Sequence, residues 1–219
     1  MSNNQIPGIS LTSIYNNPAL VSPNSSFILP FYETRETLFD TETYEDFLKN
    51  AISRFRKSRT YKHYKSFLMN LGLDRCQFMG NITSEMATIE MHHNMLTIFD
   101  IALIITEHIL NTQGMISTFD LVMLLKQEHK NHRVQLTMLC KTAHQLYTNT
   151  DDIFIHPSMC IGNWMEFLNR YSTGITQDIA YKLVFYLNDA IKNDGSNDNG
   201  LLEARDKIME WNKFNQCFR

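Results

Sequence analysis

Three histidines have the residue type and the spacing to carry out hydrolysis assisted by a metal ion. His92 and His93 end a run that alternates apolar and polar residues, and His144 follows a second run of this kind. In a β-hairpin backed by a helix, a residue that ends the first strand and one on the helix can face each other across one ion. We therefore expect His92 and His144 to bind a divalent metal. His93, beside the open face of that metal, is then placed to take a proton from water that attacks a phosphodiester.

A basic segment precedes these histidines. Residues 49–65 contain seven Lys or Arg and no Asp or Glu, interleaved with aromatic side chains. A helix with such a face can follow the phosphates of a nucleic acid, and the alternative is an ordinary solvated face. The residues that we expect to contact phosphate are Arg54, Arg56, Lys57, Arg59 and Lys62.

The elements that position these residues follow from the hydrophobic periodicity. The alternating runs 87–91 and 134–138 predict two short strands, and the second leads directly into a short helix over about 140–147. Apolar residues at helical spacing predict further helices on both sides of the strands and between them. These helical patterns cover about 41–71, 97–110, 117–125, 164–168, 175–191 and 201–211.

This order of elements predicts an α+β fold that is mostly helical, with a central ββα hairpin–helix motif. The chain divides into an extended arm rich in Asn, Ser and Pro, a basic amphipathic helix, a ββα core with a helical insertion, and a helical C-terminal region. The corresponding ranges are 1–40, 41–75, 76–160 and 161–219.

Two segments carry a resemblance to a known family. The segment CQFMGNITSEMATIEMHH, residues 76–93, resembles the opening of an HNH endonuclease, the ββα-metal or His-Me finger class, in which a strand ends in a His-His or Asp-His pair. The segment VQLTMLCKTAHQLY, residues 134–147, is similar to the second half, in which a strand runs into a helix that bears a histidine. The resemblance implies that His92 and His144 bind the metal and that His93 is the general base. The MATIEMHH-type segment also resembles phage-encoded proteins.

The chain departs from the HNH pattern at its zinc knuckles. Each Cys-x-x-Cys pair keeps only its first cysteine. Met79 replaces the second cysteine of the pair that begins at Cys76, and Ala143 replaces that of the pair that begins at Cys140. A structural zinc site with four cysteine ligands therefore cannot form.

Two positions near the expected active site also differ from the family. Gln135 occupies the Asn position of the second strand, and Thr148 stands where the helix often supplies another ligand. The remaining groups suit a water-rich Mg²⁺ site better than a tetrahedral Zn²⁺ site, although Mg²⁺, Mn²⁺ and Zn²⁺ all stay open. A third ligand could come from His129 or His132, which lie just before the second strand.

Composition limits the location and the partners. The net charge is −3, so a nucleic-acid contact would need a local basic patch. The most apolar stretch, residues 95–110, is too short for a bilayer span and carries charged residues, and no secretory signal precedes it. We therefore expect a cytoplasmic protein with reduced cysteines that does not bind membranes. Its oligomeric state stays open.

Two functions from different classes fit these observations. The first is a metal-dependent endonuclease that hydrolyses DNA, with His93 as the base and His92 and His144 on the metal. The alternative is a non-catalytic phage protein, either nucleic-acid-binding or structural, that keeps a degenerate HNH scaffold. The losses at Gln135, at Thr148 and at both knuckles favour this alternative.

Overall fold

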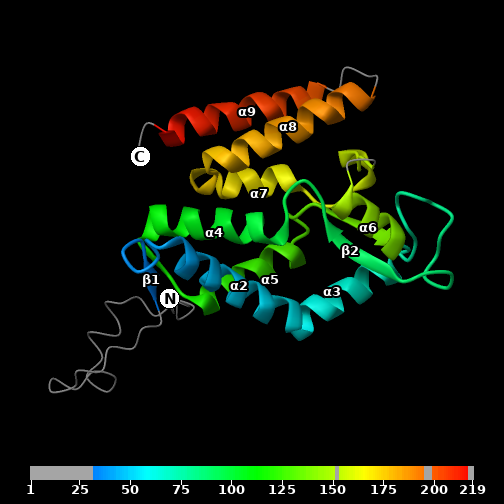
Figure 1. Ribbon diagram of the computed structural model, residues 1–219, viewed down its shortest axis with the longest axis horizontal. Coiled ribbons are helices and arrows are strands. Elements are labelled where there is room, and N and C mark those ends of the chain that lie inside the picture. The colour runs from blue at the N-terminus through cyan, green and yellow to red at the C-terminus, as the bar shows by residue number, and fades with distance from the viewer. Residues whose placement is uncertain (1–31, 151–152, 195–198, 217–219) are drawn as a thin grey trace, which may run out of the picture.

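A computed structural model describes residues 32–150, 153–194 and 199–216 (Figure 1). The fold is α+β and mostly helical, as the periodicity predicts. Most of the arm expected over 1–40 lies outside the described residues, and residues 33–34 form a short strand. The α-helices are α2 (Thr41–Lys57), α3 (Arg59–Asn70), α4 (Ile98–Gln113), α5 (Thr118–Lys130), α6 (Lys141–Asn149), α7 (Trp164–Arg170), α8 (Gln177–Asp194) and α9 (Asn199–Gln216).

Helix α4 lies at the centre of the helical layers. Ala102 and Ile104 lie on nearly opposite sides of the helix and are both completely buried, as expected for a helix that is covered all round. In Figure 1, α2 and α5 lie on one side of α4, α7 lies on the other, and the hairpin of α8 and α9 lies beyond α7. A capping box between Thr97 and Asp100 begins α4 and satisfies amide groups of its first turn.

The principal sheet is an antiparallel pair of strands, β2 (Ile89–His93) and β4 (Leu136–Cys140). The segment between them contains α4, α5 and the short strand β3 (Met115–Ile116), which pairs with β1 (Glu33–Thr34). Helix α6 begins immediately after β4 and packs on the sheet. The predicted order of strand, helical insertion, strand and helix is therefore present, with each strand about two residues later than the alternation suggests.

The basic segment forms two helices and not the single helix expected over 41–75. Ser58 has an extended backbone (φ −68°, ψ 149°) and divides α2 from α3. Its hydroxyl accepts a hydrogen bond from the Tyr61 amide at 3.2 Å, so Ser58 is the N-cap of α3. The cations before Ser58 therefore lie on a different helix from those after it.

The structure also has two short 3₁₀ turns, η1 (Pro157–Met159) and η2 (Ser172–Gly174). Gly174 permits close packing between η2 and α4, because a Cβ atom at this position would lie 2.0 Å from the carbonyl oxygen of Ile104. Within the described part of the chain, no helix is both long enough and apolar enough to cross a membrane.

Candidate functional site

The two adjacent histidines of β2 lie on opposite faces of the sheet. Burial alternates along the strand, with Ile89, Met91 and His93 buried and Glu90 and His92 partly exposed. This is the period of two that an extended strand imposes on its side chains. The expected mechanism requires His93 to lie beside the open face of a metal bound by His92. His93 lies on the other face of the sheet, so this requirement is not met.

His92 and His144 do come together on the α6 side of the sheet. Their ring centroids are 4.7 Å apart with the edge of one ring towards the face of the other, and Tyr147 makes a similar contact with His92. His144 Nδ1 forms a 2.6 Å hydrogen bond with Glu90 Oε2. Burial, and secondly the neighbouring His144, lowers the pKa of His92 to about 4, so this ring is neutral near pH 7.

His93 is instead directed into the core, where it meets His129 of α5. The two Nε2 atoms are 2.8 Å apart. His129 Nδ1 lies 2.7 Å from the carbonyl oxygen of Leu125, which can only accept, so Nδ1 carries a proton. In neutral His129 the Nε2 atom is then the acceptor, and we assign His93 Nε2 as the donor.

The surroundings of this pair keep both rings uncharged. Burial is the main cause that holds the pKa of His93 well below its usual range, and burial also lowers the pKa of His129 to about 4. A general base must reach the proton that it removes. His93 is buried and its Nε2 is already engaged, so it has no access to a water molecule on the α6 side.

The structure does not bring the other two histidines to the His92–His144 pair. His129 contacts His93 on the opposite face, and His132 Nδ1 lies 3.0 Å from the hydroxyl of Tyr64. Among the described residues, no group of three or more His, Cys, Asp or Glu side chains is arranged to hold a metal ion. The divalent metal therefore stays a prediction that rests on His92 and His144.

The cations of the basic segment do not share one face. Arg56 and Lys57, at the end of α2, line a hollow of about 550 Å³ against the start of α4. Arg59, after the break at Ser58, lines a separate groove between α3 and α5. A single helical face that follows phosphates is therefore not formed.

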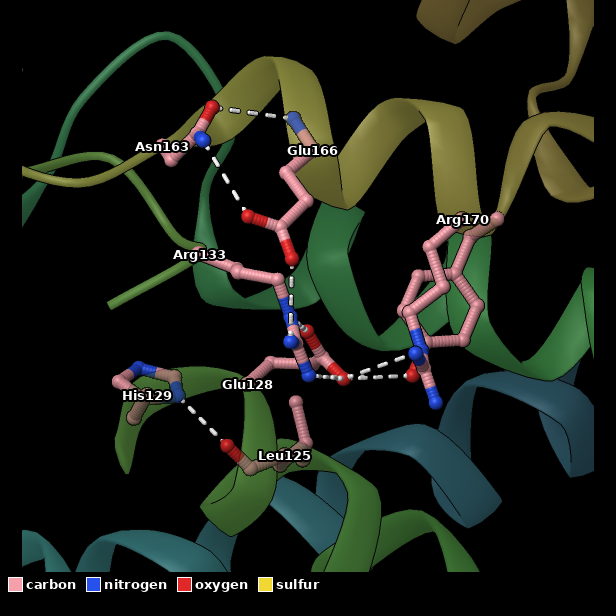
Figure 2. Close-up of polar contacts among 8 residues, drawn as sticks. Leu125, Glu128, His129, Arg133, Asn163, Glu166 and Arg170 are labelled. Carbon is pink, nitrogen blue, oxygen red and sulfur yellow. Dashed lines mark hydrogen bonds and ion pairs between the residues drawn. The ribbon is translucent and has the colours of Figure 1, made fainter. Parts of the chain in front are cut away.

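Sequence reasoning missed Glu128, which is the centre of a buried ionic network (Figure 2). Its carboxylate is completely buried and accepts two hydrogen bonds from the guanidinium of Arg133, at 2.6 and 3.1 Å, and one from the hydroxyl of Tyr171 at 2.8 Å. Arg170 lies 3.6 Å from the same carboxylate, and Arg133 also binds Glu166 at 3.2 Å. The network joins the end of α5 to α7, and the hydrogen bond to Glu128 is the main cause that raises the pKa of Arg133.

Asn94, which follows β2 directly, was also missed. It is completely buried, and its amide nitrogen donates to the carbonyl oxygen of Ile155 at 3.2 Å. The hydroxyl of Tyr147 donates to its carbonyl oxygen at 3.0 Å, and Tyr186 of α8 lies 2.6 Å from its amide nitrogen. Asn94 therefore connects the sheet, α6 and α8. The only signal in the sequence was the position of Asn94 directly after a predicted strand. Such a position gives little indication that a polar residue is buried.

Comparison with known proteins gives one match. A profile of the family described as "Bacteriophage G278-like virion protein" matches residues 22–214. No curated protein and no solved structure matches the chain.

This match confirms the phage origin and overturns the nuclease. A virion protein family points to a structural role, so the expectation of a DNA hydrolase with His93 as its base is wrong. The expectation of DNA binding also conflicts with that role. The geometry agrees, because the expected base is engaged inside the core and the expected phosphate contacts lie on separate surfaces. The structural alternative fits the findings better.

Proposed function

The chain belongs to the bacteriophage G278-like virion protein family, and on this premise we propose that it is a non-catalytic structural protein of the phage particle. The family match over residues 22–214 is the observation that carries this proposal. In this role the folded chain presents surfaces to other components of the particle and performs no reaction.

The interior supports this reading because its polar groups hold the fold together. Glu128 links α5 to α7, Asn94 links the sheet to α6 and α8, and the His93–His129 pair links β2 to α5. Buried polar groups with satisfied hydrogen bonds rigidify a core and favour one arrangement of it. A rigid body of this kind suits a protein whose function is to hold neighbours in place.

The test is whether the chain is part of the particle. We expect it to co-purify with phage through a density gradient and a high-salt wash, at a constant copy number per particle by quantitative mass spectrometry. A non-structural phage protein made in the same infection serves as the control for contamination. Its presence in the infected cell together with its absence from washed particles would refute the proposal.

A second measurement separates structure from catalysis. His92→Gln/His144→Gln changes the only histidine pair on the α6 side within the described residues, and it leaves the core pair intact. We expect phage that carry this change to keep the protein in the particle and to retain infectivity within a few-fold of the parent. A large loss of infectivity with normal incorporation would contradict a non-catalytic role.

A further inference from the structure

A groove lies between α3 and α5, on the side of α5 that bears His129. It has a volume of about 860 Å³, in the range of pockets that hold ligands or short peptide segments. We refer to it as the α3–α5 groove. His92 and His144 do not line it, whereas His129 and His132, which were expected as possible additional metal ligands, do.

The interior of the α3–α5 groove is apolar and held in place. The buried rings of Phe55 and Tyr64 each contact the ring of His129, with the centroids of Phe55 and His129 4.5 Å apart. Phe67 and Met123 also line the groove and are 46% and 37% exposed. Exposed apolar side chains around a preformed hollow are typical of a surface that another chain covers.

The rim of the groove is cationic. Arg59 of α3 and Lys126 and Lys130 of α5 line it, and no Asp or Glu does. Among the described residues these three cations form no ion pair, whereas Lys49, Arg133 and Lys182 are each paired with a carboxylate. The rim thus offers positive charge that the described chain leaves uncompensated.

We propose that the α3–α5 groove docks an acidic segment of another virion protein, with an apolar side chain of that segment inserted between Phe67 and Met123. This inference rests on the proposed structural function. Apolar contact inside and carboxylates at the rim would match both properties of the groove. The first 31 residues of this chain contain no Asp or Glu, so charge complementarity points to another chain as the source.

The arrangement of the cations favours an acidic peptide over a nucleic acid. Arg56 and Lys57 line the separate hollow beside α4, so they do not join Arg59, Lys126 and Lys130 in a continuous basic surface that could follow successive phosphates. An acidic segment needs only the local cluster, together with the apolar interior.

The experiment places a photo-crosslinking residue, p-benzoylphenylalanine, at Met123 in particles assembled with the full chain. The same residue at Met86, which is 66% exposed and does not line the groove, is the control. Mass spectrometry then identifies the segment attached to each position. We expect position 123, and not position 86, to be joined to a segment of another virion protein that is rich in Asp and Glu.

Charge reversal tests the rim. We expect Lys126→Glu/Lys130→Glu to lower the crosslink yield at position 123 by about tenfold, as expected for two lost partly exposed ion pairs and added repulsion. Lys62→Glu/Lys141→Glu changes the net charge equally on exposed residues outside the groove and should leave the yield unchanged. Lys126→Gln/Lys130→Gln, which adds no like charge, should give a smaller decrease, and circular dichroism checks that each variant is folded.

The outcomes separate the two proposals. If the chain is absent from particles, the structural function fails. If the chain is present but position 123 crosslinks to DNA, to a second copy, to a segment without acidic residues or to nothing, the docking inference is overturned while the structural function stands. Equal yields in the two charge-reversed variants would also overturn it.

Discussion

Glu128 and His129 are consecutive residues near the end of α5, and both are buried, yet they stabilise the fold in different ways. Glu128 is directed towards α7, where Arg133 and Tyr171 donate to its carboxylate. His129 is directed towards β2, where its Nε2 meets that of His93. Its Nδ1 donates to the carbonyl oxygen of Leu125 in its own helix (Figure 2). One residue is held as part of an ion pair and the other as a neutral ring.

The difference shows what each kind of buried group requires. A buried carboxylate is stable only with opposite charge and hydrogen bonds around it, and removal of one partner leaves the other charge unpaired. A buried imidazole has no such partner charge in this core, and it stays stable because it remains neutral. The Glu128 network is therefore sensitive to the loss of a partner, whereas the His93–His129 pair is sensitive to protons.

The largest effect should come from removal of the Glu128 carboxylate. Glu128→Ala leaves the guanidinium of Arg133 largely buried without its main partner, so we expect the free energy of unfolding to fall by about 3–5 kcal/mol. Urea unfolding at pH 7.5 measures this change. Glu166→Ala is the control, because Glu166 binds the same arginine but its side chain is 53% exposed, and its loss should cost less than about 1 kcal/mol. Similar small losses in both variants would contradict a special role for Glu128.

The second effect is a loss of stability in acid that arises from His129. Its folded pKa is about 4, below the unfolded value of 6.5, so the unfolded chain binds the proton first as the pH falls. The stability contributed by the neutral His129 ring is thus fully present above about pH 6.5 and is lost progressively as the pH falls to about 4. Between pH 7.5 and 5.0 we expect His129 alone to contribute a loss of about 2 kcal/mol, and the lowered pKa values of His93 and His92 act in the same direction.

The variant His129→Gln sharpens this result, because it removes the titrating ring while it keeps a polar side chain. The quantity to compare is the slope of unfolding free energy against pH in the parent and in the variant, not the stability at one pH. We expect a shallower slope in the variant. Identical slopes would show that the core pair is not the source of the acid sensitivity.

A smaller effect is expected from the hydroxyl that completes the Glu128 network. Tyr171→Phe removes the 2.8 Å hydrogen bond to Glu128 but keeps the ring, so we expect a loss of about 1.5 kcal/mol. Tyr181→Phe, at an exposed tyrosine of α8, should change stability by less than about 0.5 kcal/mol. Thermal or urea unfolding of both variants distinguishes a buried charge-assisted bond from a surface hydroxyl.

The smallest effect should be at the hydrogen bond between Glu90 and His144 on the α6 side. Glu90 and His144 are each about one third exposed, so Glu90→Gln should cost less than about 1 kcal/mol in urea unfolding. A loss above 2 kcal/mol would place this pair in the same class as Glu128 and remove the contrast between the core network and the partly exposed pair.

Local patterns in the sequence predicted much of the fold. The end of the helical pattern near residue 71, the start of another at residue 117 and the order of strand, insertion, strand and helix all follow from neighbouring residues. The structure contains them, with Leu71 as the C-cap of α3 and Ser117 as the N-cap of α5. The approach of His144 to the first strand followed from the same order of elements. The placement of His93 did not, although the period of two in a strand already separates it from His92.

Residues far apart in the chain decided the rest. His93 meets His129 across 36 positions, and Tyr171 reaches Glu128 across 43, so no local spacing could reveal either contact. The break at Ser58 also sends the basic residues to two separate surfaces.

The sequence by itself determined the helical periodicity, the helix caps and the alternation of the strands, because these depend on backbone geometry and on neighbours a few residues away. Only the tertiary structure decided that His93 lies in the core, that Glu128 is an internal ion-pair centre and that an apolar groove is lined by cations that form no ion pair with the described residues. Burial and pairing arise when distant elements pack together, and they determine whether a polar side chain supports the fold or remains available to a partner.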